Sequence, residues 1–301
     1  MDINNQDNFI EVQNQNIMKT ILCPTDFTPA SLNAVRYAFE LNKTFKSKII
    51  LFHAYYVPVP TTDLPAFIPD AQNIRQEALN RLSEIRDQMK NEFPTVTAKV
   101  ELQVAEGNPV TGIEEMQKDQ EVSLIISGTR GASGLRKFLA GSNSARFTVK
   151  SACPVITVPD GSKFRPFNKI VFATNYAEGD FENIEQVIDF AKPFNAQVIM
   201  LHISTGNLDK TAEFASIEHF KERIAEDSHY ANLTFKLMES KNIEEGLLNY
   251  LDEVKADLIA MTNRHRSFFQ KFFERSLTKQ VAFDTHTPLL AFHEAEQEVY
   301  L

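Results

Sequence analysis

The segment Gly128–Ser142 has the residue types and spacing best suited to chemistry. It reads GTRGASGLRKFLAGS, which is the pattern Gly-x2-Gly-x9-Gly-Ser. An apolar run, Val122–Ser127, precedes it and is typical of a buried parallel strand. The sequence that follows, NSARFTVKSA, indicates a helix with Ser142 near its start. Glycines between a strand and a helix allow positive φ and close approach to a ligand, and N–H groups at a helix start favour an anion such as phosphate.

The segment matches neither of two common phosphate-binding patterns. A Walker A loop needs a lysine after its last glycine, and the dinucleotide fingerprint is GxGxxG. The alternative to an anion site is an ordinary loop with tight turns. The cations in or beside the segment are either a solvated surface or a device that raises the local anion concentration. They are Arg130, Arg136, Lys137 and Arg146.

The glycine spacing resembles the ATP-binding signature of the universal stress protein family. Three further segments resemble the first, second and last strands of that family, in the same order: Ile21–Phe27, Ile49–His53 and Pro154–Val158. The resemblance covers roughly residues 18–159, and a weaker copy covers the rest. It implies an α/β fold of two tandem Rossmann-like domains of the adenine nucleotide alpha hydrolase type. Each would be a five-stranded, mostly parallel sheet with helices on both faces.

The resemblance also implies a site for ATP, which Mg²⁺ could accompany through the phosphates. Gly128 and Gly131 would let the chain wrap the ribose and phosphates, and residues 141–144 would offer N–H and hydroxyl groups. Asp26 would lie near the ribose, and Ile49 matches an adenine-contacting position. The full implied set is Pro24, Thr25, Asp26, Ile49, Gly128, Arg130, Gly131, Gly141, Ser142, Asn143 and Ser144.

Several of these residues also have simpler interpretations. Asp26 could cap the following helix, and Ile49 could belong to the core. Asn143 departs from the small apolar residue usual at that position in the family. His53 and His202 occupy the same place in the two copies, and a residue kept in a copy without the glycine motif is more simply structural.

The rest of the chain alternates between strand and helix signals, which predicts a parallel sheet covered on both faces. Thr28 and Pro29 are suited to the N-cap and first position of a helix. Four prolines indicate a loop over Val57–Asp70. The other predicted elements of the first copy are strands at Lys19–Thr25, Lys48–Tyr55 and Val96–Val104, a helix at Ala71–Phe93, and a short helix from Pro109 to about Lys118.

The pattern then restarts, which indicates a tandem duplication. Ile170–Tyr176 repeats Ile21–Phe27, and Leu258–Thr278 repeats Leu124–Ser144. We therefore predict a lead-in without order at 1–17, a first domain at 18–160, a linker at 161–166 and a second domain at 167–301. The two domains are called the first and second repeats below.

The second repeat lacks most of the residues implied in binding. Asp26 is replaced by Asn175, and the three glycines are replaced by Thr262, His265 and Arg275. Of Asp26, the three glycines and Ser142, only the serine keeps its match, Ser276. The sequence therefore predicts one nucleotide per chain, held in the first repeat, with the second repeat as scaffold.

The last strand of each repeat predicts how the repeats assemble. Pro154–Val158 and Pro288–Phe292 are short and apolar, and an uncovered edge strand tends to pair. Family members commonly pair through this strand. We expect the repeats to pair there as a pseudo-dimer within one chain, and a homodimer of two chains is possible.

Composition narrows the function classes. A net charge of −9 without a basic face argues against nucleic-acid binding. No apolar run approaches the ~18 residues of a membrane span, and the polar first residues do not resemble a signal peptide. Cys23 and Cys153 are expected to be buried, reduced thiols, which fits a cytoplasmic protein. No cluster with metal-ligand spacing is visible.

The function that these features favour is regulatory ATP binding in a stress response. No nucleophile with a matching base is visible, so we predict no enzyme activity beyond slow ATP hydrolysis. The main alternative is a protein–protein interaction module of the same fold that binds no nucleotide. An ATP-dependent ligase of a related adenine-binding fold would need catalytic segments that the sequence does not show.

Overall fold

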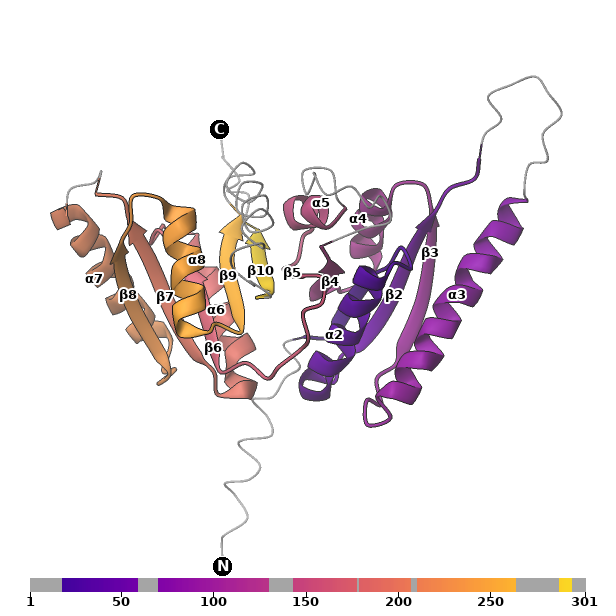
Figure 1. Ribbon diagram of the computed structural model, residues 1–301, viewed down its shortest axis with the longest axis horizontal. Coiled ribbons are helices and arrows are strands. Elements are labelled where there is room, and N and C mark those ends of the chain that lie inside the picture. The colour runs from indigo at the N-terminus through magenta and orange to yellow at the C-terminus, as the bar shows by residue number, and fades with distance from the viewer. Residues whose placement is uncertain are drawn as a thin grey trace, which may run out of the picture.

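The ten strands among the described residues form one continuous sheet, in the order β3-β2-β1-β4-β5-β10-β9-β6-β7-β8 (Figure 1). The structure is a computed structural model that describes residues 18–58, 70–129, 143–177, 179–206, 210–263 and 287–293. The predicted lead-in at 1–17 and most of the glycine segment lie outside these residues.

Each repeat contributes five strands in the same succession of strand and helix. The first repeat contains β1 (Thr20–Pro24), α2 (Pro29–Phe45), β2 (Lys48–Tyr55), α3 (Ala71–Glu92), β3 (Val100–Glu106), α4 (Pro109–Asp119), β4 (Leu124–Gly128), α5 (Asn143–Lys150) and β5 (Val155–Val158). The second contains β6 (Lys169–Ala173), α6 (Asp180–Ala191), the 3₁₀ turn η1 (Lys192–Phe194), β7 (Gln197–Ser204), α7 (Lys210–Asp227), β8 (Leu233–Glu239), α8 (Ile243–Val254), β9 (Leu258–Asn263) and β10 (Leu289–His293).

Strands within a repeat are parallel, and the repeats join through one antiparallel pair. Leu289 of β10 lies opposite Thr157 of β5, and Ala291 lies opposite Val155. This confirms the predicted pairing of the last strands within one chain. Because β5 and β10 run in opposite directions, the amino end of β5 lies beside the carboxyl end of β10, and β9 ends at the same edge on the far side of β10.

The helix starts follow from local sequence. The Thr28 side chain accepts from the N–H of Ser31 at the start of α2, and Pro29 occupies the first turn, as predicted. Asp70 caps α3, and Asn108 caps α4. Each cap satisfies one of the N–H groups that a helix start leaves without a partner in the helix.

The third strand begins later than predicted. We expected Val96–Val104, but β3 starts at Val100, where it pairs with Ile49 of β2. The Val96 N–H donates to the Phe93 carbonyl at 3.0 Å in the turn after α3, and the Val96 side chain is buried in the core. The alternating pattern therefore extended beyond the strand into a largely exposed turn whose Val96 side chain is buried.

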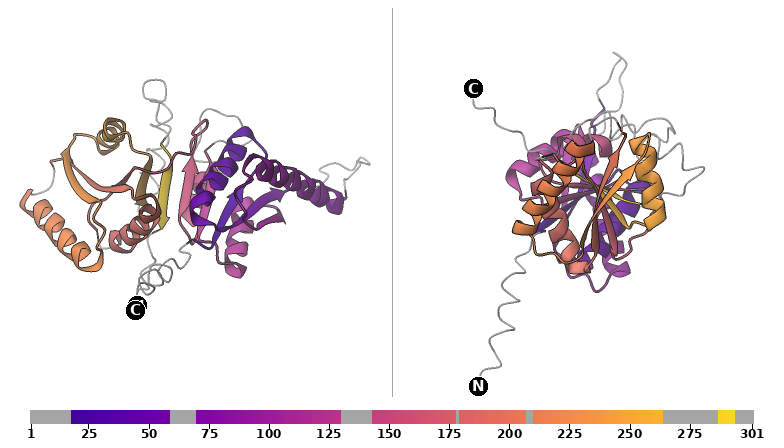
Figure 2. Two further views of the ribbon diagram at one scale, coloured as in Figure 1. Left: turned by 90° about the horizontal axis from the view of Figure 1, so that it is seen from below. Right: turned by 90° about the vertical axis from the view of Figure 1, so that its left-hand side faces the viewer.

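Helices cover both faces of the sheet (Figure 2). One face carries α2, α3, α6 and α7, and its core runs through both repeats. On the opposite face, α4 and α5 cover the first repeat, and α8 covers the second. The strands are buried because both faces are covered, which explains their continuous apolar runs.

A cluster of aromatic rings ties the repeats together on the shared face. Phe45 at the end of α2 stacks on Phe190 of α6, with ring centroids 5.2 Å apart. Phe167, in the connection between repeats, contacts Phe190 at 5.3 Å. The Asn33 side chain donates to the Ser162 carbonyl at 2.8 Å, so α2 also holds this connection by a hydrogen bond.

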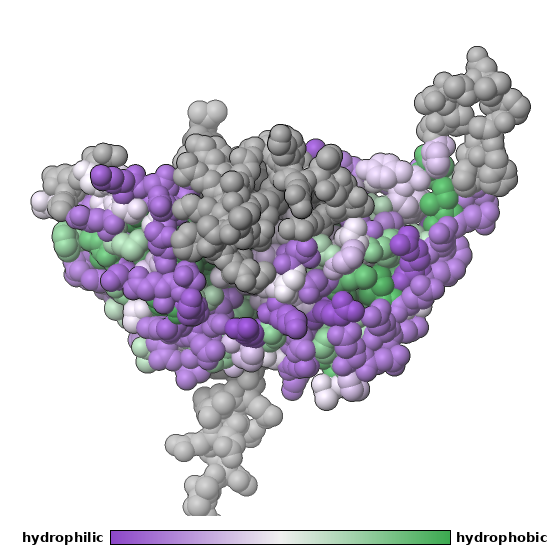
Figure 3. All heavy atoms as spheres, viewed as in Figure 1, coloured by the Kyte–Doolittle hydropathy of each residue, from purple (hydrophilic) through white to green (hydrophobic). Residues whose placement is uncertain are grey.

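The surface of the drawn face is largely polar, with small scattered hydrophobic areas (Figure 3). The exposed large hydrophobic side chains among the described residues are Tyr56, Phe214 and Ile243. Within the same residues, no helix combines the length and apolar character needed to cross a membrane.

Candidate functional site

The strand order of the first repeat reverses between β1 and β4. The chain proceeds from β1 outward to β2 and β3, then crosses to β4 on the other side of β1. Ile21 of β1 lies opposite Leu124 of β4, so the carboxyl ends of the two strands are neighbours. In open α/β sheets, ligands bind outside the carboxyl ends of strands at such a switch point.

The turn after β1 is held by its own polar side chains. The Thr25 hydroxyl accepts from the N–H of Phe27 at 3.0 Å and lies 2.9 Å from the Ser31 hydroxyl. Phe27 has a φ of 65°, a left-handed conformation that costs energy in a residue with a side chain. Pro24 is buried at the end of β1. Thr25 therefore holds this turn, and Pro24 ends the strand that leads into it.

Asp26 lies in this turn, beyond the end of β1, and is partly buried. One of its carboxylate oxygens accepts from the hydroxyl of Thr28 at 2.6 Å and from the Thr28 N–H at 3.1 Å. Thr28, not Asp26, is the N-cap of α2. Asp26 therefore holds the cap residue, and its role toward a nucleotide stays a prediction.

His53 supports this turn from β2. Its Nδ1 lies 2.8 Å from the Thr25 carbonyl oxygen, and its ring centroid lies 4.2 Å from that of Phe27. Burial lowers the pKa of His53, and the Thr25 carbonyl acts in the opposite direction. His202 has the equivalent contact in the second repeat, because its Nδ1 lies 3.0 Å from the Thr174 carbonyl oxygen. The shared contact supports the structural interpretation of both histidines.

Gly128 differs from its predicted role as a flexible turn residue. It is the last residue of β4, and it is not among the described glycines with positive φ. A Cβ on Gly128 would lie 2.5 Å from the Ala30 carbonyl oxygen in the first turn of α2. The position needs glycine because the helix backbone approaches the strand closely.

Ser144 fixes the start of α5 to the end of β4. Its buried hydroxyl donates to the Gly128 carbonyl and lies 2.8 Å from the Ser127 hydroxyl. Asn143 is the first residue of α5. The α5 start therefore adjoins the carboxyl end of β4, as the motif predicts, and the Ser144 hydroxyl is directed inward. Contacts of residues 143 and 144 with phosphate stay predictions.

Four predicted site residues lie outside the described residues: Arg130, Gly131, Gly141 and Ser142.

Ile49 does not reach the site. It is fully buried in the core, and it pairs with Ile21 and Val100 near the amino end of β2. Near the carboxyl end of β2, which Tyr55 closes, Ala54 is partly buried and packs toward the α4 and α5 face. Ala54 follows Ile50 and Phe52 on the other face of β2, and counting alternate residues from Ile50 was the signal that could have found it. The interpretation of Ile49 as core is correct.

The second repeat replaces the Gly128 contact with a buried hydrogen-bond network. Thr262, at the position of Gly128, donates to one Asp180 carboxylate oxygen at 2.6 Å, and Thr174 donates to the other at 2.6 Å. The Asn183 amide donates to the Thr262 hydroxyl at 2.8 Å. Asp180, at the position of Ser31, is the first residue of α6, so α6 begins two residues later than α2. The later start leaves room for the threonine.

The carboxyl edge of β7 in the second repeat is also more closed. Glu213 of α7 is buried and accepts from the Ser204 hydroxyl at 2.8 Å, and it lies 3.6 Å from Nε2 of His202. Ile203, at the position of Ala54, is a larger residue and is buried. The carboxyl end of β7 is therefore covered by larger side chains than the carboxyl end of β2 at the position of Ala54.

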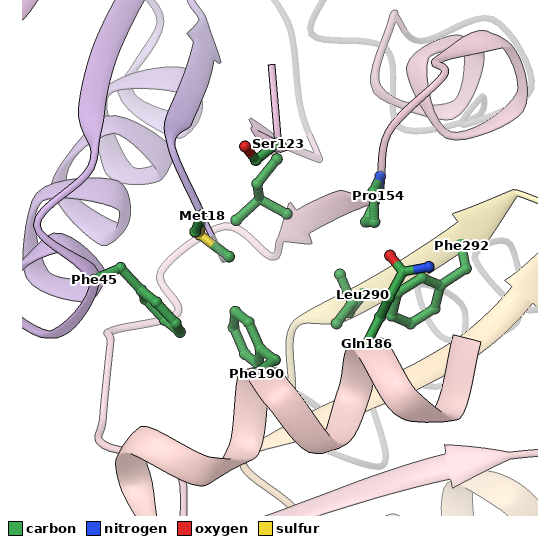
Figure 4. A pocket seen from close by; sticks show the side chains of 9 residues that line it. Met18, Phe45, Ser123, Pro154, Gln186, Phe190, Leu290 and Phe292 are labelled. Carbon is green, nitrogen blue, oxygen red and sulfur yellow. The ribbon is translucent and has the colours of Figure 1, made fainter. Parts of the chain in front are cut away.

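A separate cavity lies between the repeats at the amino ends of β4 and β5. Its volume is about 60 Å³, and its walls are mostly apolar (Figure 4). The lining residues are Met18, Phe45, Ser123, Leu124, Pro154, Gln186, Phe190, Leu290 and Phe292. It lies at the opposite end of the strands from Asp26, and its size suits a few water molecules, not a nucleotide.

Other candidate chemistry is limited among the described residues. Both cysteines are free and buried. The described part of the chain contains no group of three or more His, Cys, Asp or Glu side chains that could hold a metal ion.

The universal stress protein family model matches residues 18–159 and again 166–293. The two matches together cover most of the chain, one on each repeat. The chain therefore belongs to the universal stress protein family and carries two such domains in tandem. Its sheet, with the switch point between β1 and β4 in the first repeat, is the α/β arrangement that the resemblance implied.

Similar proteins agree with this assignment. The universal stress protein MJ0531 of Methanocaldococcus jannaschii is 29% identical over 153 residues, which are 50% of this chain and 86% of that protein. YxiE of Bacillus subtilis is 29% identical over 143 residues, 46% of this chain and 97% of its own. A universal stress protein structure from Archaeoglobus fulgidus covers 93% of this chain and 100% of its own, with a TM-score of 0.69 at 19% identity.

Proposed function

We propose that the chain binds one adenine nucleotide, ATP, in the first repeat and has a regulatory role in a stress response. Nucleotide binding is typical of the family. The observation that carries the proposal is the switch point itself. There Asp26 follows β1, and the glycine segment joins β4 to the start of α5. Anions are stabilised at a helix start by the free N–H groups and the helix dipole.

The described part of the site fits a nucleotide. Ala54 leaves the carboxyl edge of β2 with a small side chain, suitable beside a flat base. Ser144 fixes the start of α5 at the end of β4, so the N–H groups there are held in place. A triphosphate brings its own metal ion, which takes oxygen ligands and water. Such an ion needs few protein ligands.

The second repeat supports a single site. Ile203 puts a larger side chain at the position of Ala54, where a base would approach, and Glu213 is bonded to the neighbouring Ser204. Asn175 stands in place of Asp26, and the matching glycines are absent from the sequence. We therefore propose the domain limits 18–160 and 167–301, with the first domain as the nucleotide-binding one. The buried free cysteines support a reducing, cytoplasmic location.

Two measurements test this function: chromatography of nucleotide released from the protein, and native mass spectrometry of the intact chain. Purified protein is denatured, and the supernatant is chromatographed for adenine nucleotides. Native mass spectrometry then counts nucleotides per chain. One per chain, lost in Gly131→His, is the expected result. No nucleotide after incubation with ATP and Mg²⁺ would favour a protein–protein module, and two per chain would contradict the asymmetric site. The homodimer also stays a prediction, which sedimentation analysis checks.

A further inference from the structure

The helix that follows the glycine segment is held at both ends by different repeats. At its start, Ser144 bonds to the end of β4 within the first repeat. At its end, the Asn263 side chain of the second repeat donates to the Thr148 carbonyl at 2.9 Å. Asn263 is the last residue of β9. This contact is possible because the antiparallel β5–β10 pair brings the carboxyl end of β9 beside the end of α5.

The Asn263 bond satisfies a carbonyl that the helix leaves open. In a continuing helix the N–H of Ala152 would donate to the Thr148 carbonyl, but it donates to the Gln117 side chain at 3.4 Å. The preceding carbonyl, of Phe147, has its helical partner in the Ser151 N–H at 3.0 Å. Carbonyls at a helix end need such outside partners. Asn263 supplies one from the other repeat.

His293 of the second repeat faces the same helix end. It is the last residue of β10, and a hydrogen bond to the Phe147 carbonyl partly opposes the lowering of its pKa by burial. Two neighbouring strands of the second repeat thus end against α5. The first repeat has Thr129 and Pro159 at the matching positions, and proline has no N–H and no polar side chain to donate.

Because α5 is short, its stability depends on these contacts at its end. The helix has eight residues, so its ends are about 12 Å apart at ~1.5 Å per residue. Helices this short are marginal in isolation and depend on tertiary contacts. A bond at the last turn therefore affects the order of the first turn, where a phosphate would bind.

We propose that Asn263 is a positioning residue through which the second repeat fixes α5, and thereby the phosphate end of the nucleotide site in the first repeat. The second repeat then also stabilises the binding site in the first repeat, in addition to its role as scaffold. The proposal rests on the proposed nucleotide binding for its functional consequence. The hold on α5 itself is independent of any ligand.

The test compares four variants of the full chain, three at Asn263 and one control at Asn33. Asn263→Asp keeps the side-chain shape but places a carboxylate oxygen against the Thr148 carbonyl, and Asn263→Leu removes the amide without adding charge. Asn33→Asp is the matched control, because it removes another amide-to-carbonyl bond, to Ser162, that lies away from α5. Hydrogen exchange of the α5 amides is measured without nucleotide, and ATP affinity is measured by calorimetry.

We expect faster hydrogen exchange of the α5 amides in Asn263→Asp and Asn263→Leu. Both should also raise the Kd for ATP roughly three- to tenfold, the scale of one hydrogen bond. Asn263→Gln, which keeps the amide, should restore part of the affinity. The control should change neither quantity. Equal effects from the control, or no change in α5 exchange with Asn263→Leu, would overturn the proposal. If the wild-type chain binds no ATP, the proposed function fails, and exchange alone decides whether Asn263 holds α5.

Discussion

Replacing Gly128 with alanine should destabilise the chain even without nucleotide. The added Cβ would lie 2.5 Å from the Ala30 carbonyl oxygen and 2.8 Å from its carbon, whereas ordinary contacts begin near 3.4 Å. Both atoms are backbone, in a helix turn held by the Thr28 cap and by Pro29. The clash therefore cannot be relieved by rotating a side chain, and α2 must move away from β4.

The expected cost follows from two opposing effects. Overpacking of this kind costs about 1–3 kcal/mol. Replacing glycine also restricts the unfolded chain, which returns about 0.4–1 kcal/mol. The net loss in the free energy of unfolding should be about 1–2 kcal/mol. Urea denaturation of nucleotide-free protein measures it as a lower transition midpoint.

Gly112→Ala is the matched control. There the closest atom to the added Cβ is Cζ of Phe52, at 2.9 Å, which is the far end of a side chain. The ring can shift, and alanine gains about 0.8–1 kcal/mol over glycine within helix α4. We expect a change of less than about 0.5 kcal/mol, because the two effects largely offset each other. Wild-type stability of Gly128→Ala, with only ATP binding impaired, would refute the close-packing argument and return Gly128 to a purely ligand-related role.

Four further predictions concern the site, the second repeat and two titratable groups. Gly141→Arg should weaken ATP binding at least tenfold, about 1.4 kcal/mol, with the fold intact because the second repeat has arginine there; unchanged affinity by calorimetry would remove the segment from the site. Asp180→Ala leaves the buried Thr174 hydroxyl and the partly buried Thr262 hydroxyl without this partner and should cost about 2–4 kcal/mol in urea unfolding, whereas Asp180→Asn should cost much less; equal losses would argue against the network. Burial lowers the pKa of His53, so the unfolded chain binds a proton at a higher pH than the folded chain does. The contribution of His53 to the free energy of unfolding should be fully present above about pH 6.5 and be lost as the pH falls below it. In urea titrations from neutral to acidic pH, His53→Gln should flatten this dependence. Burial raises the pKa of both cysteine thiols, that of Cys153 to about 12. A disulfide reagent at mildly alkaline pH should therefore label neither Cys23 nor Cys153 until urea unfolds the chain. Rapid labelling of the native protein would contradict their burial.

The sequence by itself determined the order of elements and the asymmetry of the repeats. Strand and helix alternate with clear periodicity, and the caps at Thr28 and Asn108 are local features, so the elements could be predicted from neighbours along the chain. The pairing of the last strands was also predicted correctly, from their apolar character together with the family resemblance. The loss of the glycines in the second repeat can be counted directly in the sequence.

The tertiary structure decided which residues meet across long separations. Periodicity assigns a residue to a face, but the register of β2 against its neighbours is what sends Ile49 to the core and brings Ala54 to the edge. The sequence shows that position 128 is glycine, but only the approach of α2 shows that its Cβ would meet the Ala30 carbonyl. The bond from Asn263 to α5 joins residues 115 positions apart. It exists because an antiparallel strand pair turns the second repeat's carboxyl edge toward the end of a first-repeat helix, and no local pattern encodes that geometry.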